Sequence, residues 1–261
     1  MGVNKMKVKN IQFGHDKTNY LFNDLNLEIP RGKITTIIGP NGCGKSTLLG
    51  LLTKGHKVKQ GEITLDGTNI TTIKQKPFAR KVAVLHQHNN ENLQITIREL
   101  VAYGRTPHQG VCEGITEEAE KIIDWALECT KLSELQHRPL SALSGGQRQR
   151  AWLAMALCQQ PEILFLDEPT TYLDMYYQME LLDLVKKLNA QYNMTIVMVL
   201  HDINQALNYS DHIIVMKSGK VLKVGTPKDM ADEKLIQEVY KIQGKFYEED
   251  GKYYLLPLAT C

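Results

Sequence analysis

The sequence predicts an α/β fold with a mainly parallel sheet, an N-terminal antiparallel β subdomain and an inserted helical subdomain. Three observations predict it. A β-branched run at 34–38 leads into a glycine-rich turn and then a helical pattern. Continuous apolar runs at 163–166 and 195–200 are typical of parallel strands buried on both faces. Between these regions, residues from about 95 to 160 have a helical pattern with few strand signals.

The remaining strands are predicted from alternating apolar residues, β-branched side chains and flanking glycines. They are residues 6–13 and 20–29, which form a hairpin, then 61–67, 82–85, a second hairpin of 212–216 and 221–224, and a final strand near 253–256. This distribution places strands at both ends of the chain and leaves its middle to helices.

The helices are predicted from apolar periodicity and capping residues. Thr96 and Thr116 are expected N-caps, and Thr116 precedes an acidic first turn that suits the helix dipole. Further helices are predicted at 147–159, at 175–188 as a crossover between parallel strands, and near 229–242.

Composition indicates an ordinary globular protein: of 261 residues, 43% are hydrophobic and 23% charged, with a net charge of +2. Nothing in that charge balance calls for a nucleic-acid partner. Five scattered cysteines without a C-x-x-C spacing suggest neither a zinc site nor disulfides, so we expect a reducing, cytoplasmic location. No apolar run reaches the ~18 residues of a membrane span, and the N-terminus lacks a signal-peptide core. We therefore expect another polypeptide to hold this protein at any membrane where it works.

The glycine-rich turn fits the phosphate-loop pattern G-x-x-x-x-G-K-[ST]. Its residues are Gly39, Pro40, Asn41, Gly42, Cys43, Gly44, Lys45, Ser46 and Thr47. Backbone N–H groups and a helix N-terminus would face the phosphates of a nucleotide. Lys45 would reach the β- and γ-phosphates, and the Ser46 hydroxyl would ligate Mg²⁺.

Two acidic residues follow the apolar strand at 163–166. Side chains alternate at a strand end, so Asp167 and Glu168 can serve different roles. Asp167 would hold Mg²⁺ directly or through water, and Glu168 would polarise the water that attacks the γ-phosphate. The alternative is a strand that ends in solvated acids.

A second candidate anion site is Ser144, Gly145, Gly146 and Gln147, at the start of a predicted helix. Ser144 is a good N-cap, and the two glycines would open backbone N–H groups to an anion. A chain with two anion-binding helix termini but one Mg²⁺ site is explained if each terminus binds a different nucleotide in a dimer. The alternative is a capped core helix that binds nothing.

With these motifs in place, nearly the whole chain resembles the ATP-binding subunits of ABC transporters. Leu143–Gln147 resembles the signature motif, Gln87 the Q-loop glutamine, Thr170–Asp174 the D-loop, and His201 the switch histidine. The resemblance implies a P-loop ATPase core, with an ABC ATPase domain over 6–242, the helical subdomain at about 90–160 inserted in it, and a C-terminal tail at 243–261.

The resemblance also implies the cofactors and the mechanism. ATP and Mg²⁺ are expected, with Ser46, Gln87 and Asp167 near the metal. Two identical cassettes would pair head to tail, so that the signature of one covers the γ-phosphate held by the other. His201 would orient the γ-phosphate and the attacking water, beside the base Glu168, and Asp174 belongs to the D-loop.

The adenine contact departs from the family pattern, which usually has an aromatic residue there. His15 occupies that place and can stack, although less strongly than tyrosine. Phe13 and Tyr20 are the alternatives.

Tyr103–His108 resembles the G-R-x-P-H element of the ferric-siderophore, haem and cobalamin importer branch, and Arg105–His108 is interpreted as a surface near the membrane subunit. The resemblance implies an ATPase that powers ferric-siderophore import from the cytoplasmic face of the cell membrane. Its partners would be a second ATPase subunit, multi-span permease subunits and, indirectly, a substrate-binding protein. The alternatives are a haem, cobalamin or zinc/manganese importer ATPase, or a soluble ATPase of iron–sulfur assembly.

Overall fold

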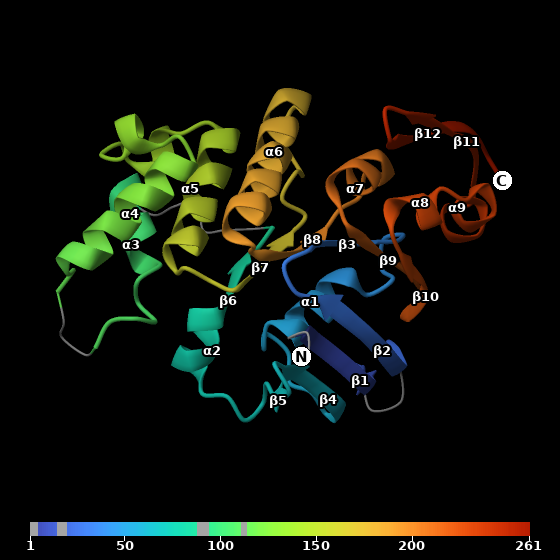
Figure 1. The fold of residues 1–261 in the computed structure, drawn as a ribbon, viewed down its shortest axis with the longest axis horizontal. Helices are drawn as coiled ribbons and strands as arrows, with labels where there is room; N and C mark the ends of the chain where they lie inside the picture. Colours follow the sequence, from blue (N-terminus) through green and yellow to red (C-terminus); the bar gives the residue numbers. More distant parts are fainter. Residues whose placement is uncertain (1–4, 15–19, 88–93, 111–113) are drawn as a thin grey trace. The chain divides into compact units, whose positions relative to one another are not determined.

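The computed structural model describes residues 5–14, 20–87, 94–110 and 114–261 (Figure 1). The chain divides into two units, Met1–Ile73 with Thr195–Cys261, and Lys74–Met194. The second unit is therefore inserted, in sequence, between the two segments of the first.

The first unit contains an antiparallel sheet in the strand order β2-β1-β4-β5. Its strands are β1 (Lys5–Phe13), β2 (Phe22–Pro30), β4 (Gln60–Leu65) and β5 (Thr68–Asn69). β1 pairs antiparallel with both β2 and β4, which confirms the predicted N-terminal hairpin. The apolar residues that alternate in the sequence, such as Val8, Ile29 and Ile63, are buried on one face.

The first unit also carries parallel strands around β3 (Ile34–Ile38). β3 pairs parallel with β8 (Thr195–Val199) and with β9 (His212–Lys217), and β9 pairs antiparallel with β10 (Lys220–Gly225). Every residue of β3 and β8 is buried, as their continuous apolar runs predict. The helix α1 (Lys45–Leu52) follows the turn after β3.

The end of the chain differs from the prediction. The predicted helix at 229–242 is two helices, α8 (Pro227–Met230) and α9 (Glu233–Tyr240), because the Asp232 side chain caps a new helix by accepting from Lys234 N and Leu235 N. The final strand is one half of a hairpin, β11 (Ile242–Glu249) with β12 (Lys252–Thr260). Asp250 and Gly251 turn it with φ of 50° and 73°, which suits a type I′ turn.

In the second unit, β6 (Val82–Leu85) and β7 (Ile163–Asp167) pair in parallel. The helices of this unit are α2 (Gln75–Lys81), α3 (Ile97–Tyr103), α4 (Glu117–Cys129), α5 (Gly145–Cys158) and α6 (Met175–Tyr192). α3, α4 and α5 pack against one another. The crossover helix after β7 is present as α6, four residues longer than predicted.

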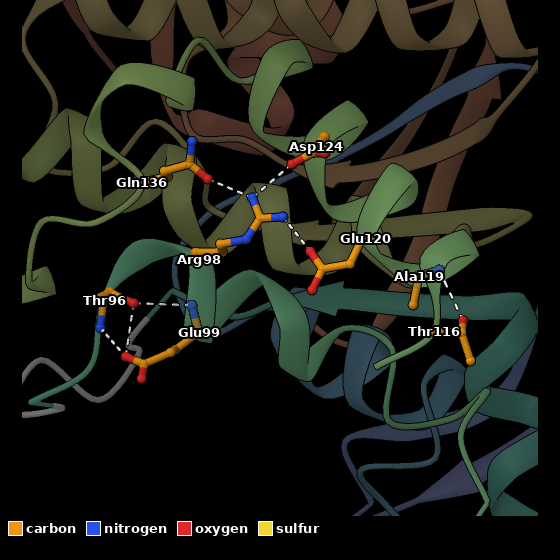
Figure 2. Close-up of polar contacts among 8 residues, drawn as sticks. All are labelled: Thr96, Arg98, Glu99, Thr116, Ala119, Glu120, Asp124 and Gln136. Carbon is orange, nitrogen blue, oxygen red and sulfur yellow. Dashed lines mark hydrogen bonds and ion pairs between the residues drawn. The ribbon is translucent and has the colours of Figure 1, made fainter. Parts of the chain in front are cut away.

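Capping residues begin the helices α3 and α4 as predicted (Figure 2). Thr96 forms a capping box with Glu99, and the Thr116 hydroxyl accepts a hydrogen bond from Ala119 N. Arg98 then joins the two helices, because its guanidinium bonds to Glu120 and Asp124 of α4. The last contact has an N···O distance of 2.7 Å. In the parts of the chain that the structure describes, no helix has the length and apolar character to cross a membrane.

Candidate functional site

The strand, glycine-rich turn and helix of the phosphate-loop motif are present as β3, residues 39–44 and α1. Lys45 is only 5% exposed, and its Nζ donates to the carbonyl oxygens of Gly39 at 2.8 Å and Pro40 at 3.2 Å. These bonds hold the ammonium across the turn. Carbonyl oxygens can be exchanged for the oxygens of an anion, so the arrangement suits a phosphate.

The inner side of this turn is closely packed. Gly39 has a φ of 153°, and a Cβ there would lie 2.2 Å from Met216 O and 2.9 Å from Cys43 Sγ. Cys43 is buried, which raises the pKa of its thiol, and its carbonyl oxygen accepts from Gly219 N at 3.0 Å. At Gly44, with φ of 107°, a Cβ would meet the Phe22 ring at 2.7 Å. Neither glycine can therefore be replaced without moving neighbouring groups.

His201 lies at the same sheet edge as the phosphate loop. Carboxyl ends of neighbouring parallel strands share an edge, and β3 and β8 are such neighbours. Leu200 N donates to Ile37 O at 3.3 Å, so Leu200 lies beside the end of β3, one residue before the phosphate loop begins. His201 is exposed, and Asp202 then caps α7 (Ile203–Tyr209) by accepting from Gln205 N.

The three candidates for the adenine contact differ in whether the structure describes them and in how exposed their rings are. His15 lies outside the described residues. Phe13 is buried, with its ring centroid 6.5 Å from that of Phe22 and 5.4 Å from that of His56, so it packs in the core. Tyr20 is 52% exposed. Among the described residues, Tyr20 is thus the candidate whose ring is open to a ligand.

In the second unit, Gln87 and the two acidic residues also share a sheet edge. β6 and β7 are parallel with Leu85 opposite Leu166, and all three residues follow these positions. Gln87 Nε2 donates to Glu168 Oε2 at 2.8 Å. Glu168 has a left-handed backbone with φ of 51°, whereas Asp167 is the last residue of β7.

The Ser144–Gln147 segment begins α5 with a capping box. The Ser144 hydroxyl accepts from Gln147 N at 3.3 Å, and Ser144 N donates to Gln147 Oε1 at 3.1 Å. Gly145 is exposed, and a Cβ there would meet no atom within 4 Å. A Cβ on Gly146 would lie 2.9 Å from the Tyr177 ring of α6. One glycine therefore leaves the helix start open, and the other allows α5 to pack against α6.

Asp174 of the D-loop motif caps α6, because its carboxylate accepts from Tyr177 N at 3.1 Å. The loop before it and the start of α5 enclose a cavity of about 120 Å³. Its lining residues are Gln87, Gly145, Arg148, Gln149, Trp152, Glu168, Thr171, Tyr172 and Leu173. The second unit thus brings the Q-loop glutamine, the candidate base and the signature helix together.

The proposed magnesium ligands fit that ion by chemistry. Ser46, Gln87 and Asp167 offer hydroxyl, amide and carboxylate oxygens, which Mg²⁺ prefers. The described residues contain no group of three or more His, Cys, Asp or Glu side chains that could hold a metal. Magnesium typically keeps few protein ligands and binds with substrate phosphates.

Comparison with known proteins decides the family. A family model described as ABC transporter matches residues 22–171, more than half of the chain. The chain belongs to the ABC transporter family. Among its relatives are the petrobactin import ATP-binding protein FpuC of Bacillus anthracis, 41% identical over 97% of this chain and 92% of the relative, and the iron(3+)-hydroxamate import ATP-binding protein FhuC of Bacillus subtilis, 42% identical over 93% and 90%.

Solved structures of the ABC family have the same fold. CbiO1 from Clostridium perfringens, part of the ABC transporter complex cbiONQ, matches with a TM-score of 0.80 and 28% identity over 91% of this chain and 94% of that one. The ATP-binding cassette MJ0796, dimeric and bound to ADP and Pi, matches with a TM-score of 0.73 and 30% identity over 85% and 98%. The predicted P-loop ATPase fold is confirmed, and this chain is an ATP-binding, ATP-hydrolysing ABC protein.

The ABC protein also has contacts that the sequence analysis missed. Arg105, interpreted there as part of a contact surface, is only 7% exposed. Its Nη1 donates to Cys158 O at 2.9 Å, and His108 Nε2 lies 2.9 Å from Gln159 O. Arg105 and His108 thus cap the last carbonyls of α5, and the surface interpretation is wrong for the buried Arg105. The bond between Gln87 and Glu168 was also missed, because it joins residues 81 positions apart.

Proposed function

We propose that this chain is the ATP-hydrolysing subunit that powers import of a ferric siderophore through a membrane ABC transporter. The observation that carries the proposal is the similarity to relatives named for petrobactin import and for iron(3+)-hydroxamate import, over 90% or more of each chain. The first name specifies petrobactin, and the second specifies iron(3+) bound to a hydroxamate.

In the first unit, residues Gly39–Thr47 bind the phosphates of ATP. Lys45 leaves the carbonyl oxygens of Gly39 and Pro40 and takes up the charge of the β- and γ-phosphates. His201, at the same sheet edge, orients the γ-phosphate. His15 remains the proposed adenine contact, with the exposed Tyr20 as its alternative.

In the second unit, Glu168 is the general base that takes a proton from the attacking water. Its Oε2 accepts hydrogen bonds from Gln87 Nε2 at 2.8 Å and from Thr171 Oγ1 at 3.5 Å, which orient the carboxylate. Asp167 and Gln87, together with Ser46, are the proposed Mg²⁺ ligands. When bound, Mg²⁺ neutralises charge on the β- and γ-phosphate oxygens.

The signature residues Ser144–Gln147 are proposed to act on the ATP of a second, identical subunit. Gly145 supports this role, because it is exposed and the N-terminus of α5 attracts an anion. Asp174, which caps α6, would hold the D-loop in place. The dimeric cassette MJ0796 supports pairing of such chains.

The proposed partners follow from the transport role. They are multi-span permease subunits, which hold the ATPase at the cytoplasmic face of the membrane, and a substrate-binding protein that the ATPase does not touch. The sequence offers no membrane-spanning run of its own.

Uptake by whole cells tests the proposal. A host strain that lacks this chain should lose uptake of labelled iron from at least one ferric siderophore, while uptake of haem, cobalamin, zinc and manganese stays normal. The intact chain should restore uptake, and a Lys45→Ala variant should not. Normal siderophore uptake together with loss of another cargo would refute the siderophore assignment and leave the ATPase assignment standing.

A further inference from the structure

The helix that follows His201 is hydrogen-bonded to the C-terminal hairpin. Asn204 of α7 donates through Nδ2 to Leu255 O at 3.1 Å, and Leu255 N donates to Asn204 Oδ1 at 2.6 Å. One turn later, Asn208 Nδ2 donates to Tyr253 O at 3.0 Å. These three bonds fix β12 along α7, and the first two lie only three residues from His201.

The other strand of the hairpin, β11, follows α9, whose last residue is Tyr240. Lys217 Nζ donates to Glu238 O at 2.9 Å, so α9 is bonded to the end of β9. The Tyr240 hydroxyl is buried and has no hydrogen-bond partner among the described residues. Burial and the neighbouring Cys43 raise the pKa of Tyr240, and the Gly39 amide opposes that rise. The Tyr240 hydroxyl therefore lies near Gly39 and Cys43 of the phosphate loop.

We infer that α9, β11 and β12 (Glu233–Thr260), here called the C-terminal strap, set the position of His201 relative to the phosphate loop. One end of the strap is hydrogen-bonded to α7 through Asn204, and at the other end the buried Tyr240 hydroxyl lies near Gly39 and Cys43. Asn204 and Tyr240 are thus positioning residues for ATP hydrolysis. The inference rests on the proposed roles of His201 and of the phosphate loop.

The two residues should affect different kinetic constants. Asn204→Ala removes both bonds to Leu255 and loosens the segment that carries His201, whose orientation matters most in the transition state. Tyr240→Phe keeps the ring and removes the hydroxyl. The buried hydroxyl has no hydrogen-bond partner among the described residues, and we expect it to gain one from the Gly39 amide when the loop adjusts to phosphates. That variant should therefore weaken ATP binding.

ATP turnover over a range of ATP concentrations tests the inference, with each variant purified from the host in the same assembly as the wild type. Asn204→Ala should lower kcat roughly three- to tenfold with KM nearly unchanged, the size expected for one or two hydrogen bonds. Tyr240→Phe should raise KM for ATP and leave kcat unchanged. The control is Asn26→Ala, which loses one accepted bond, from Asn10 N, and two donated bonds, to Asp24 O and Asp24 Oδ1.

Thermal unfolding of every variant separates positioning from loss of folded protein. If Asn204→Ala and Asn26→Ala lose the same stability and keep the same kcat, or if Tyr240→Phe leaves KM unchanged, the inference is overturned. His201→Ala belongs in the same assay. Normal turnover in His201→Ala would refute the proposed role of His201. If turnover is lost in His201→Ala but normal in Asn204→Ala, only the inferred positioning role of the C-terminal strap is refuted.

Discussion

The hydrogen bond between Gln87 and Glu168 shows at the scale of single residues how a strand end becomes a reactive group. Two parallel strands bring the residues together, and the backbone becomes left-handed at Glu168, directly after Asp167 ends β7. A non-glycine residue with such a φ is uncommon, and strained backbone is often found at functional sites. The conformation supports different roles for the two neighbouring acids.

Replacing Glu168 by glutamine tests its role as the base. The Glu168→Gln protein should bind ATP with near-normal affinity, because the amide is similar in size and leaves the phosphate loop intact. Its ATP turnover should fall by about 100-fold or more, the usual contribution of a general base. ATP should then trap the paired cassettes, which size-exclusion chromatography would detect.

Glu162→Gln is the matched control for that experiment. Glu162 forms an ion pair with Lys81 at 3.4 Å just before β7. Glu162 has the same carboxylate as Glu168 but lies at the other end of β7, so the Glu162→Gln substitution should leave ATP turnover unchanged. Near-normal turnover in Glu168→Gln would exclude Glu168 as the base.

At the scale of elements, α5 determines the second half of the site, and both of its ends are held by other segments. Its first turn packs against α6 at Gly146 and Tyr177, and its last carbonyls are capped by Arg105 and His108. A helix fixed at both ends presents its N-terminus in one direction. This rigidity is what an anion-binding terminus needs.

The two glycines at the start of α5 should respond differently to alanine. Gly146→Ala places a Cβ 2.9 Å from the Tyr177 ring and should lower the free energy of unfolding by about 1–3 kcal/mol through overpacking. Gly145→Ala meets no atom within 4 Å and should leave stability unchanged or slightly raised. Denaturant unfolding measures both. Equal stability of the two variants would show that α5 does not pack on α6 as described.

The other end of α5 should make stability depend on pH. Burial lowers the pKa of His108, and the nearby Arg105 and Arg80 charges lower it further, although the Gln159 carbonyl opposes them. The unfolded chain, with a histidine pKa of about 6.5, then binds more protons than the folded one below that pH. Stability should therefore fall as the pH drops from 7.5 through 6.5 and towards the folded pKa.

His108→Gln provides the comparison, because glutamine can still donate to Gln159 O but does not titrate. Thermal unfolding between pH 7.5 and 5.5 should show a smaller loss of stability in this variant than in the wild type. Identical losses in the two proteins would mean that another group accounts for the pH dependence.

At the scale of the whole molecule, local sequence patterns predicted the elements well and distant contacts poorly. The phosphate-loop strand, turn and helix could be predicted because one short motif specifies them. The N-caps Thr96 and Thr116 could be predicted because capping also depends on a few neighbouring residues. The helix predicted near 229–242 is present as α9 over Glu233–Tyr240, but its start at the Asp232 cap and the separate helix α8 were not predicted. The dipeptide Asp250-Gly251 is typical of a tight hairpin turn, so the C-terminal hairpin could also have been predicted from the sequence, but it was not.

The contacts of the C-terminal strap could not have been predicted in this way. The bonds between Asn204 and Leu255 join residues 51 positions apart, and Tyr240 reaches a loop some two hundred positions earlier in the sequence. Periodicity shows which face of an element is buried, but not which segment covers it. The same limit applies to Arg105, whose burial depends on the far end of α5.

The central claim is that ATP hydrolysis by this chain drives ferric-siderophore import. The most direct test is ATP turnover by the complex isolated from its host with its membrane subunits in lipid. A substrate-binding protein is added, loaded in turn with a ferric siderophore, haem, cobalamin, zinc or manganese. The account predicts that turnover rises only with the ferric siderophore. A rise only with another cargo, or the absence of any membrane partner, would contradict it.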